Sequence, residues 1–262
     1  MITWEQLEKT CQNCRRCKLA DGRTHVVVGD GNRGAEIMFI GEGPGRQEDL
    51  QGRPFVGPAG QLFDKMLASI GLSREKVYIC NVVKCRPPHN RDPEADEKAA
   101  CLPLLRAQVS LVKPKVIVCL GRISAQMVMW PNFRITREHG IWEERKGFWL
   151  SATYHPAALL RDPAKKRESW EDLKKLREKL WELELLPRPS FETATPSQAA
   201  ESTTTASETE ERDWSVEDLP WVEGEAAEES TFPETEEDAP AANCRLDHDL
   251  TVADFSHWEE KS

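Results

Sequence analysis

The sequence has no apolar run that approaches the ~18 consecutive residues required to span a membrane. Its first ten residues, MITWEQLEKT, contain neither a basic stretch nor an apolar core, so we expect no secretory signal peptide and a cytoplasmic protein. Hydrophobic residues make up only 39% of the 262 residues, which is low for a chain that is globular throughout. No internal repeat is present. These absences exclude membrane-spanning and repeat architectures and predict a globular part joined to a segment of different character.

Negative charge is concentrated at one end of the chain. Residues 190–262 contain 21 acidic and 3 basic side chains, a net charge of −18, so residues 1–189 carry +8 and the overall pI of 5.3 describes neither part. The acidic segment is rich in Ser, Thr, Glu, Ala and Pro without a sustained apolar period, which predicts a disordered tail. Within it, apolar side chains in residues 244–260 could form a short motif that docks on a partner protein; the alternative is a solvated tail. The basic charge of residues 1–189 favours a nucleic-acid partner.

Short apolar runs alternate with amphipathic stretches in residues 1–189. Strands are predicted at 25–28, 36–40, 77–83, 115–120, 141–144 and 147–153. Helices are predicted at 61–70, 96–112, 124–130 and 163–185. Three of the strands are nearly continuous apolar runs, which is typical of strands covered on both faces. The alternation predicts an α/β fold, a three-layer sandwich with a central, mainly parallel β-sheet flanked by helices.

A glycine-rich loop, Gly41-Glu42-Gly43-Pro44-Gly45, directly follows the strand predicted at 36–40. Ligands of open α/β sheets bind beyond the carboxyl ends of strands, where this loop lies. It is not a phosphate-binding loop, because it lacks Gly-Lys-Ser/Thr, and Pro44 breaks the dinucleotide-binding spacing. The loop is either a plain turn with a solvated glutamate or a place where the backbone approaches a ligand closely.

Several of the eight cysteines are spaced as metal ligands are. Cys14 and Cys17 form a C-x-x-C pair, with Cys11 three residues earlier, and Cys85 and Cys101 lie farther along. Four thiolates would suit zinc or an iron–sulfur cluster, and the wide spacing of the second pair favours a 4Fe-4S cluster. The alternative is a set of ordinary reduced thiols.

Two further segments follow predicted strands. In Thr153-Tyr154-His155-Pro156, a helix is expected to begin at Pro156, which would place His155 beside a helix N-terminus as a neutral hydrogen-bond donor. The basic loop 84–92, KCRPPHNRD, suits phosphate contacts. For each segment the alternative is a loop whose polar groups bond only to backbone or water.

Taken together, these motifs resemble those of the family 4 uracil-DNA glycosylases, the iron–sulfur branch of the uracil-DNA glycosylase superfamily. The resemblance runs from about Cys14 to Leu180 and leaves the acidic tail outside. It is carried by ordered blocks: C-x-x-C followed by RTHVVVGDGN, GEGPG-x-x-ED, GRPFVGPAGQL, VYICNVVKCRPPHNRDP, EKAAC, VIVCLG and YHPAALLR. It implies a base-excision DNA repair enzyme, a uracil-DNA glycosylase. Such an enzyme flips deoxyuridine out of DNA and hydrolyses the N-glycosidic bond, leaving an abasic site.

The resemblance also implies roles for individual residues. Phe55 would cover the face of the uracil, and the amide of Asn81 would read its edge. His155 would stabilise the anion that develops at uracil O2. Glu42 would either position water or stabilise the positive sugar, and both roles stay open. Further active-site positions are matched by Gly43, Glu48 and Asn90.

Two more groups of residues follow from the resemblance. It implies that a 4Fe-4S cluster is held by Cys14, Cys17, Cys85 and Cys101, with Cys11 as an alternative ligand. Contacts to DNA are expected from the basic loop and from a wedge after His155, namely Lys84, Arg86, Arg91, Leu159, Leu160 and Arg161. We therefore expect a monomer that binds uracil-containing DNA, is associated with the nucleoid if the source is prokaryotic, and could contact a repair or replication protein through its tail. The alternative function is a protein of the same fold that binds uracil-DNA without catalysis or traps it covalently through His89.

Overall fold

The computed structural model describes residues 2–188. The predicted tail with its docking motif, and the exact end of the predicted domain at residue 189, lie outside the described residues. The helices are α1 (Trp4–Gln12), α2 (Leu19–Gly22), α3 (Arg46–Gln51), α4 (Pro58–Ser69), α5 (Ala95–Val112), α6 (Arg122–Val128), α7 (Ile135–Glu138), α8 (Pro156–Arg161) and α9 (Lys166–Glu182). The strands are β1 (Asp30–Gly31), β2 (Ile37–Gly41), β3 (Tyr78–Asn81), β4 (Val116–Leu120), β5 (Trp142–Arg145) and β6 (Phe148–Thr153). Three short 3-10 helices are η1 (Arg74–Lys76), η2 (Pro88–Asn90) and η3 (Pro163–Lys165).

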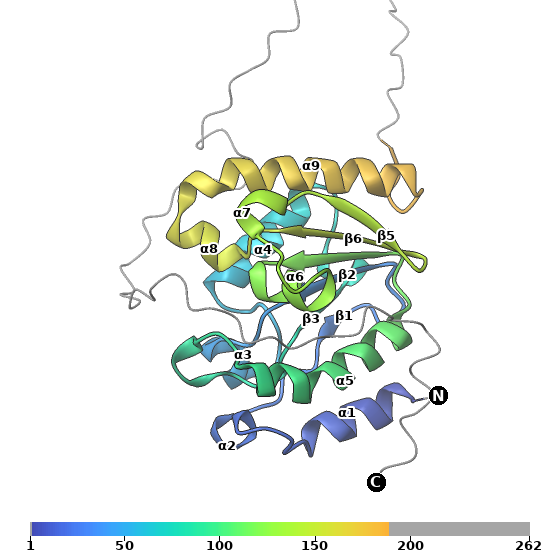
Figure 1. The fold of residues 1–262 in the computed structure, drawn as a ribbon. Coiled ribbons are helices and arrows are strands. Elements are labelled where there is room, and N and C mark those ends of the chain that lie inside the picture. The colour runs from blue at the N-terminus through green and yellow to red at the C-terminus, as the bar shows by residue number, and fades with distance from the viewer. Residues whose placement is uncertain (1, 189–262) are drawn as a thin grey trace, which may run out of the picture.

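The strands form one sheet in the order β1-β3-β2-β4-β6-β5. The four inner strands are parallel, and each edge strand pairs antiparallel with its neighbour. Helix α9 lies along one side of the sheet, while α5 lies on the other side with α1 outside it (Figure 1). The predicted three-layer α/β sandwich with a mainly parallel sheet is confirmed.

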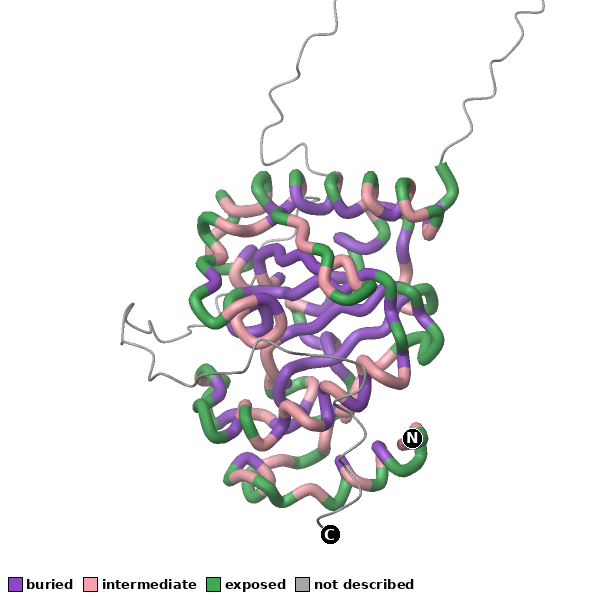
Figure 2. The backbone as a smooth tube through the Cα atoms, turned by 45° about the vertical axis from the view of Figure 1, so that its right-hand side comes forward, coloured by how far each residue is buried: buried purple, intermediate pink, exposed green. Residues whose placement is uncertain are grey.

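The inner strands β2 and β4 are apolar along their whole length because both of their faces are buried. In β2, Met38 and Ile40 point into the core beneath α1 and α5, and Ile37 and Phe39 point into the core beneath α4 and α9. Figure 2 shows the buried strands enclosed between helices whose outer surfaces are exposed. This alternation explains why the runs in the sequence lack a polar face.

One predicted strand is wrong. Residues 25–28 form no strand, and the short edge strand β1 lies immediately after them. Val27 is buried, and its N–H donates to the carbonyl oxygen of Lys84 at 2.8 Å. Residues 25–28 therefore pack against the core as an irregular segment, because β1 already pairs with the edge of β3.

The other predicted strands and helices are present, with boundaries shifted by a few residues. Between residues 2 and 188, no helix is both long enough and apolar enough to cross a bilayer.

Candidate active site

The carboxyl ends of the inner strands bring the predicted site residues to one edge of the sheet. Gly41 and Asn81 are direct neighbours at the ends of β2 and β3. Thr153, two residues before His155, ends β6 next to the end of β4. Because parallel strands end at the same edge, residues far apart in sequence meet there.

Phe55 joins this edge from the loop between α3 and α4. Its ring centroid lies 5.5 Å from that of His155, with an interplanar angle of 29°. A methyl group at Gly41 would overlap Oδ1 of Asn81 and come within 2.7 Å of the Phe55 ring. Glycine at this position therefore lets the strand backbone lie directly against both side chains.

Asn81 has a polar atom without a partner. Its side chain is almost fully buried, with 2% of the residue exposed, and Oδ1 accepts no hydrogen bond from the described residues. An unsatisfied buried acceptor is costly and calls for an explanation such as an absent ligand. This oxygen is suited to accept a hydrogen bond from a bound molecule.

The protonation state of His155 follows from its surroundings. It is the N-cap of α8, and its Nδ1 accepts from the N–H of Ala157 at 3.1 Å. Burial, aided by the nearby charge of Arg161, lowers the pKa of His155 to about 4. The imidazole is therefore neutral at pH 7 with its proton on Nε2, which makes Nε2 a hydrogen-bond donor.

In Glu42 the same effect of burial shifts the pKa in the opposite direction. Burial and the neighbouring carboxylate of Asp92 raise its pKa to about 7, against the opposing charges of Arg122 and Arg161. A carboxyl group with a pKa near neutrality can exchange a proton at physiological pH.

Glu48 bonds to backbone. Its Oε1 accepts from the N–H groups of Val56 at 2.9 Å and Gly57 at 2.8 Å. The Glu48 carboxylate therefore binds the loop that carries Phe55. This structural contact adds to the active-site position that is expected for Glu48.

The strand end that precedes His155 is anchored on α9. The Thr153 hydroxyl donates to Asp172 at 2.7 Å, and the Tyr154 hydroxyl donates to Glu168 at 2.6 Å. His139 Nδ1 lies 2.9 Å from the same Asp172 carboxylate. Helix α9 thus fixes the direction in which the chain leaves β6, and no motif in the sequence points to this network.

One predicted DNA contact of the basic loop, that of Lys84, needs a correction. Lys84 is 1% exposed, and its Nζ donates to the Asn81 carbonyl oxygen at 2.5 Å, so it cannot reach a phosphate. Arg91 donates to both carboxylate oxygens of Glu97, at 2.6 and 2.8 Å, so its charge is already paired. Arg86 donates to Asn90 Oδ1 at 2.8 Å, and Asn90 lies at the exposed end of the loop.

The predicted wedge also needs a correction. Leu159 is fully buried in the core beneath α4 and α9, so it cannot enter DNA. Leu160 is 46% exposed, and Arg161 beside it is also exposed. On α8, therefore, Leu160 is the apolar side chain that faces outward.

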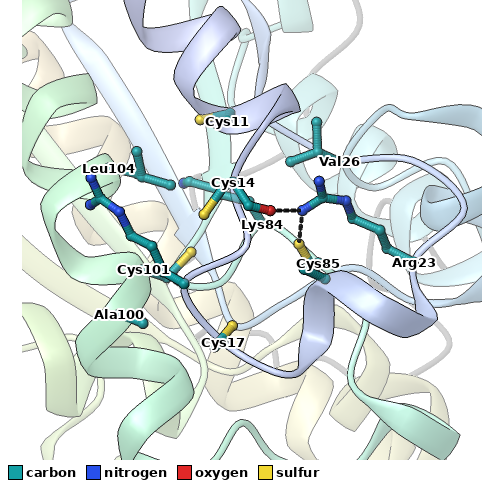
Figure 3. A pocket seen from close by; sticks show the side chains of 12 residues that line it. Cys11, Cys14, Cys17, Arg23, Val26, Lys84, Cys85, Ala100, Cys101 and Leu104 are labelled. Atoms are coloured by element: carbon teal, nitrogen blue, oxygen red, sulfur yellow. Dashed lines mark hydrogen bonds between the residues drawn. The ribbon is translucent and has the colours of Figure 1, made fainter. Parts of the chain in front are cut away.

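The cysteines converge in a second place. Cys11, Cys14, Cys17, Cys85 and Cys101 line one cavity, together with three basic side chains, those of Arg16, Arg23 and Lys84, and with apolar side chains. Figure 3 shows Cys14, Cys17, Cys85 and Cys101 around one space, with Cys11 close by on α1. All five are free thiols, and burial raises the pKa of Cys101 to about 12 and that of Cys11 to about 11.

The thiols of this cavity are its candidate metal ligands, and zinc and an iron–sulfur cluster would need them at different spacings. Within residues 2–188, no three His, Cys, Asp or Glu side chains are grouped closely enough to hold one metal ion. Zinc would need its thiolates ~2.3 Å from one point, whereas a cluster binds each thiolate through a different iron. Arg23 donates to Cys85 Sγ at 3.3 Å and to the Cys14 carbonyl oxygen at 2.9 Å, so its guanidinium lies beside two of the segments that carry these thiols.

Comparison with known proteins agrees with the resemblance. The family model of the uracil DNA glycosylase superfamily matches residues 28–174. The chain is 47% identical to a type-4 uracil-DNA glycosylase of Sulfurisphaera tokodaii over 187 residues, which cover 68% of this chain and 85% of that protein. It is 47% identical to the type-4 enzyme of Archaeoglobus fulgidus over 186 residues, covering 68% and 94%. With that of Thermotoga maritima it shares 43% over 187 residues, covering 67% and 95%. The chain therefore belongs to the uracil-DNA glycosylase superfamily, in its type-4 branch.

Proposed function

We propose that this protein releases uracil from DNA by hydrolysing the bond between C1′ of the sugar and N1 of the base, leaving an abasic site. The observation that supports this best is the unpartnered, buried Oδ1 of Asn81, next to the Phe55 ring and at the same sheet edge as His155. An amide below an aromatic ring is suited to a flat base with a polar edge.

Base recognition follows from these two side chains. The target base must leave the stack, because its C1′–N1 bond is hidden inside a duplex. Phe55 covers one face of the extruded uracil. Asn81 Oδ1 accepts from N3–H and Nδ2 donates to O4, a pattern that cytosine inverts. A cytosine would leave a buried donor or acceptor unpaired, which is strongly disfavoured.

Bond cleavage separates charge, and two groups face the products. The bonding electrons stay with the uracil, whose O2 becomes negative, and Nε2–H of neutral His155 donates to this oxygen. The sugar becomes positive until water adds to C1′ and loses a proton. The Glu42 carboxylate serves this side of the reaction, either by accepting that proton or by stabilising the positive sugar.

DNA is held outside this pocket. Leu160 fills the space that the extruded base leaves in the stack, and Arg161 and Arg86 contact phosphates nearby. Lys84 has no part in this contact, since it is buried.

The cysteine cavity is proposed to hold a 4Fe-4S cluster on Cys14, Cys17, Cys85 and Cys101. The cluster would supply a crosslink without taking part in the reaction. Its ligands come from the segment between α1 and α2, from the loop after β3, and from α5. It would thereby brace the strand end that carries Asn81.

The test is an excision assay. Iron-loaded full-length protein is incubated, without added divalent metal, with an oligonucleotide that contains one uracil, and alkali then cleaves the abasic site. A matched oligonucleotide with thymine in place of uracil is the control. We expect strand cleavage for the uracil substrate alone. Uracil-containing DNA that stays alkali-stable overturns the proposal, and tight binding without release would favour the non-catalytic alternative.

A further inference from the structure

Phe55 has a backbone conformation that its side chain disfavours. Its φ angle is +55°, in the left-handed region that a bulky residue rarely enters. Such a conformation persists only where the surrounding structure determines it, and it is often found where a side chain must be aimed. The contacts of residues 54–57 identify what determines it here.

Arg74 holds this segment from one side. Its Nη1 donates to the Pro54 carbonyl oxygen at 3.0 Å, and its Nη2 donates to the Phe55 carbonyl oxygen. Its Nε donates to Asp64 at 2.7 Å, and the side chain is only 18% exposed. A planar guanidinium fixed by a carboxylate thus presents two donors to two successive carbonyl groups.

Glu48 holds the segment from the other end. Its Oε1 accepts from the next two N–H groups, those of Val56 and Gly57. Close packing completes the arrangement, because a methyl group at Gly60 would overlap the Phe55 carbonyl group. Four backbone groups of residues 54–57, the carbonyls of Pro54 and Phe55 and the N–H groups of Val56 and Gly57, are therefore bound by two oppositely charged side chains.

We propose that Arg74 and Glu48 form a clamp on residues 54–57 that positions the Phe55 ring against the base. Both are positioning residues. The inference rests on the proposed function, in which Phe55 stacks on uracil. The clamp gives Arg74 a role in base binding. The sequence does not suggest this role, because Arg74 lies in η1, outside every motif of the site.

The competing explanation is that Arg74 only stabilises the fold through its carboxylates. Arg74 also lies 3.4 Å from Asp30, and Arg53 pairs with that same carboxylate at 2.9 Å. Within residues 2–188, Arg53 makes no hydrogen bond to the Phe55 carbonyl oxygen, and its side chain is 60% exposed. It therefore provides a matched control for loss of a cation beside Asp30.

The experiment measures the inhibition constant of free uracil, which reports base binding without DNA, and the single-turnover excision rate. All variants are full-length and iron-loaded. We expect Arg74→Met to weaken uracil inhibition about tenfold, Arg74→Lys to weaken it less, and Arg53→Met to leave it near the wild-type value. In a Phe55→Ala background, Arg74→Met should add less than about twofold, since the ring to be positioned is gone.

Glu48 supplies a second test in case Arg74→Met does not fold. Glu48→Gln keeps an acceptor oxygen for the two N–H groups and should retain most uracil binding, while Glu48→Ala should lose about tenfold. The clamp is refuted if Arg74→Met and Glu48→Ala weaken uracil inhibition by the same factor in the wild-type and the Phe55→Ala backgrounds. If the wild-type protein still releases uracil in that case, the proposed function stands. If the wild-type protein releases no uracil, the proposed function itself fails.

Discussion

At the scale of single residues, burial shifts the pKa values of His155 and Glu42 in opposite directions. It lowers the pKa of the histidine to about 4 and raises that of the carboxyl group to about 7, since both charged forms lose hydration. The histidine is thereby kept neutral as a donor, and the carboxyl group is kept able to exchange a proton near pH 7. Pairs of groups with such separated pKa values are typical of acid–base sites.

Replacement of His155 by alanine should slow uracil excision by roughly 10²–10³-fold, because the Nε2 donor to the developing O2 anion is lost. The measurement is the single-turnover rate on a uracil-containing oligonucleotide. Glutamine offers a neutral N–H donor at this position and should recover part of the rate. A rate for His155→Ala equal to that of wild type removes His155 from this role.

The pH dependence should report Glu42. Its pKa is raised from 4.5 to about 7, so the carboxylate is present above pH 7 and is lost as the pH falls through that value. We expect kcat/KM to fall on the acid side of pH 7, and Glu42→Gln to abolish this dependence and lower the rate by about 10²-fold or more. His155 stays neutral down to about pH 4 and adds no transition in this range. A flat wild-type profile between about pH 5 and pH 8 would contradict this assignment.

At the scale of elements, the strand ends and the short helices after them build the site. Each inner strand contributes backbone at one sheet edge, and α8 carries a side chain outward from it. The same helix buries Leu159 and exposes Leu160, because successive residues of a helix point in different directions. A wedge on this helix can therefore consist of a single apolar side chain.

Leu160→Ala should reduce kcat/KM on duplex DNA about tenfold, since no side chain then fills the vacated stack. The reduction should be smaller on single-stranded DNA, where less stacking has to be replaced. Ile141→Ala is the matched control, because Ile141 is similarly exposed, at 44%, and lies between α7 and β5. Equal losses for the two variants, or equal losses on both substrates, would count against Leu160 as the wedge.

At the scale of the whole molecule, the cysteine cavity joins segments that are distant in sequence. Cys14 and Cys17 precede α2, Cys85 follows β3, and Cys101 lies in α5. Buried Lys84 lies in the wall of the cavity and donates to the Asn81 carbonyl oxygen, so the cavity is in contact with the residue proposed to read the base. Loss of a bound cluster should therefore affect stability together with the site.

Cys101→Ser should lose bound iron and lower Tm by roughly 5 °C or more, because the binding energy of a ligated centre is folding energy. Iron content, visible absorbance and thermal melting measure this. Cys11→Ser is the informative comparison, since Cys11 lines the same cavity outside the expected ligand set. Retention of iron by Cys11→Ser and its loss in Cys101→Ser support the assignment; the reverse result makes Cys11 the ligand.

Much of the fold could be predicted because its signals are local. Strands β2 and β4 are apolar along their length, and α4 and α9 carry apolar stripes. The prediction of a strand at 25–28 is wrong because an apolar run indicates that side chains are buried, and does not indicate that the backbone pairs with a neighbouring strand. The edge of the sheet beside it was already occupied by β1.

The site was predictable where a residue follows a strand. Asn81 ends β3, Glu42 follows β2 and His155 follows β6, so their strands bring them to one sheet edge. Phe55, which lies in the loop between α3 and α4, was expected at the site only from the resemblance. Charged residues of the basic loop were not predictable in this way. A lysine or arginine in a loop has the same local sequence whether it faces solvent, a carboxylate or a buried carbonyl.

The sequence by itself therefore determined the sheet, the residues at its edge and the number of thiols, because apolar periodicity and motif spacing are written along the chain. Only the tertiary structure decided which cations are free, which leucine of α8 faces outward, and which side chains hold Phe55. Those properties depend on neighbours that folding brings from distant positions, such as Glu97 for Arg91 and the loop carbonyl groups for Arg74. Burial and hydrogen-bond pairing are properties of the assembled core, and no local pattern encodes them.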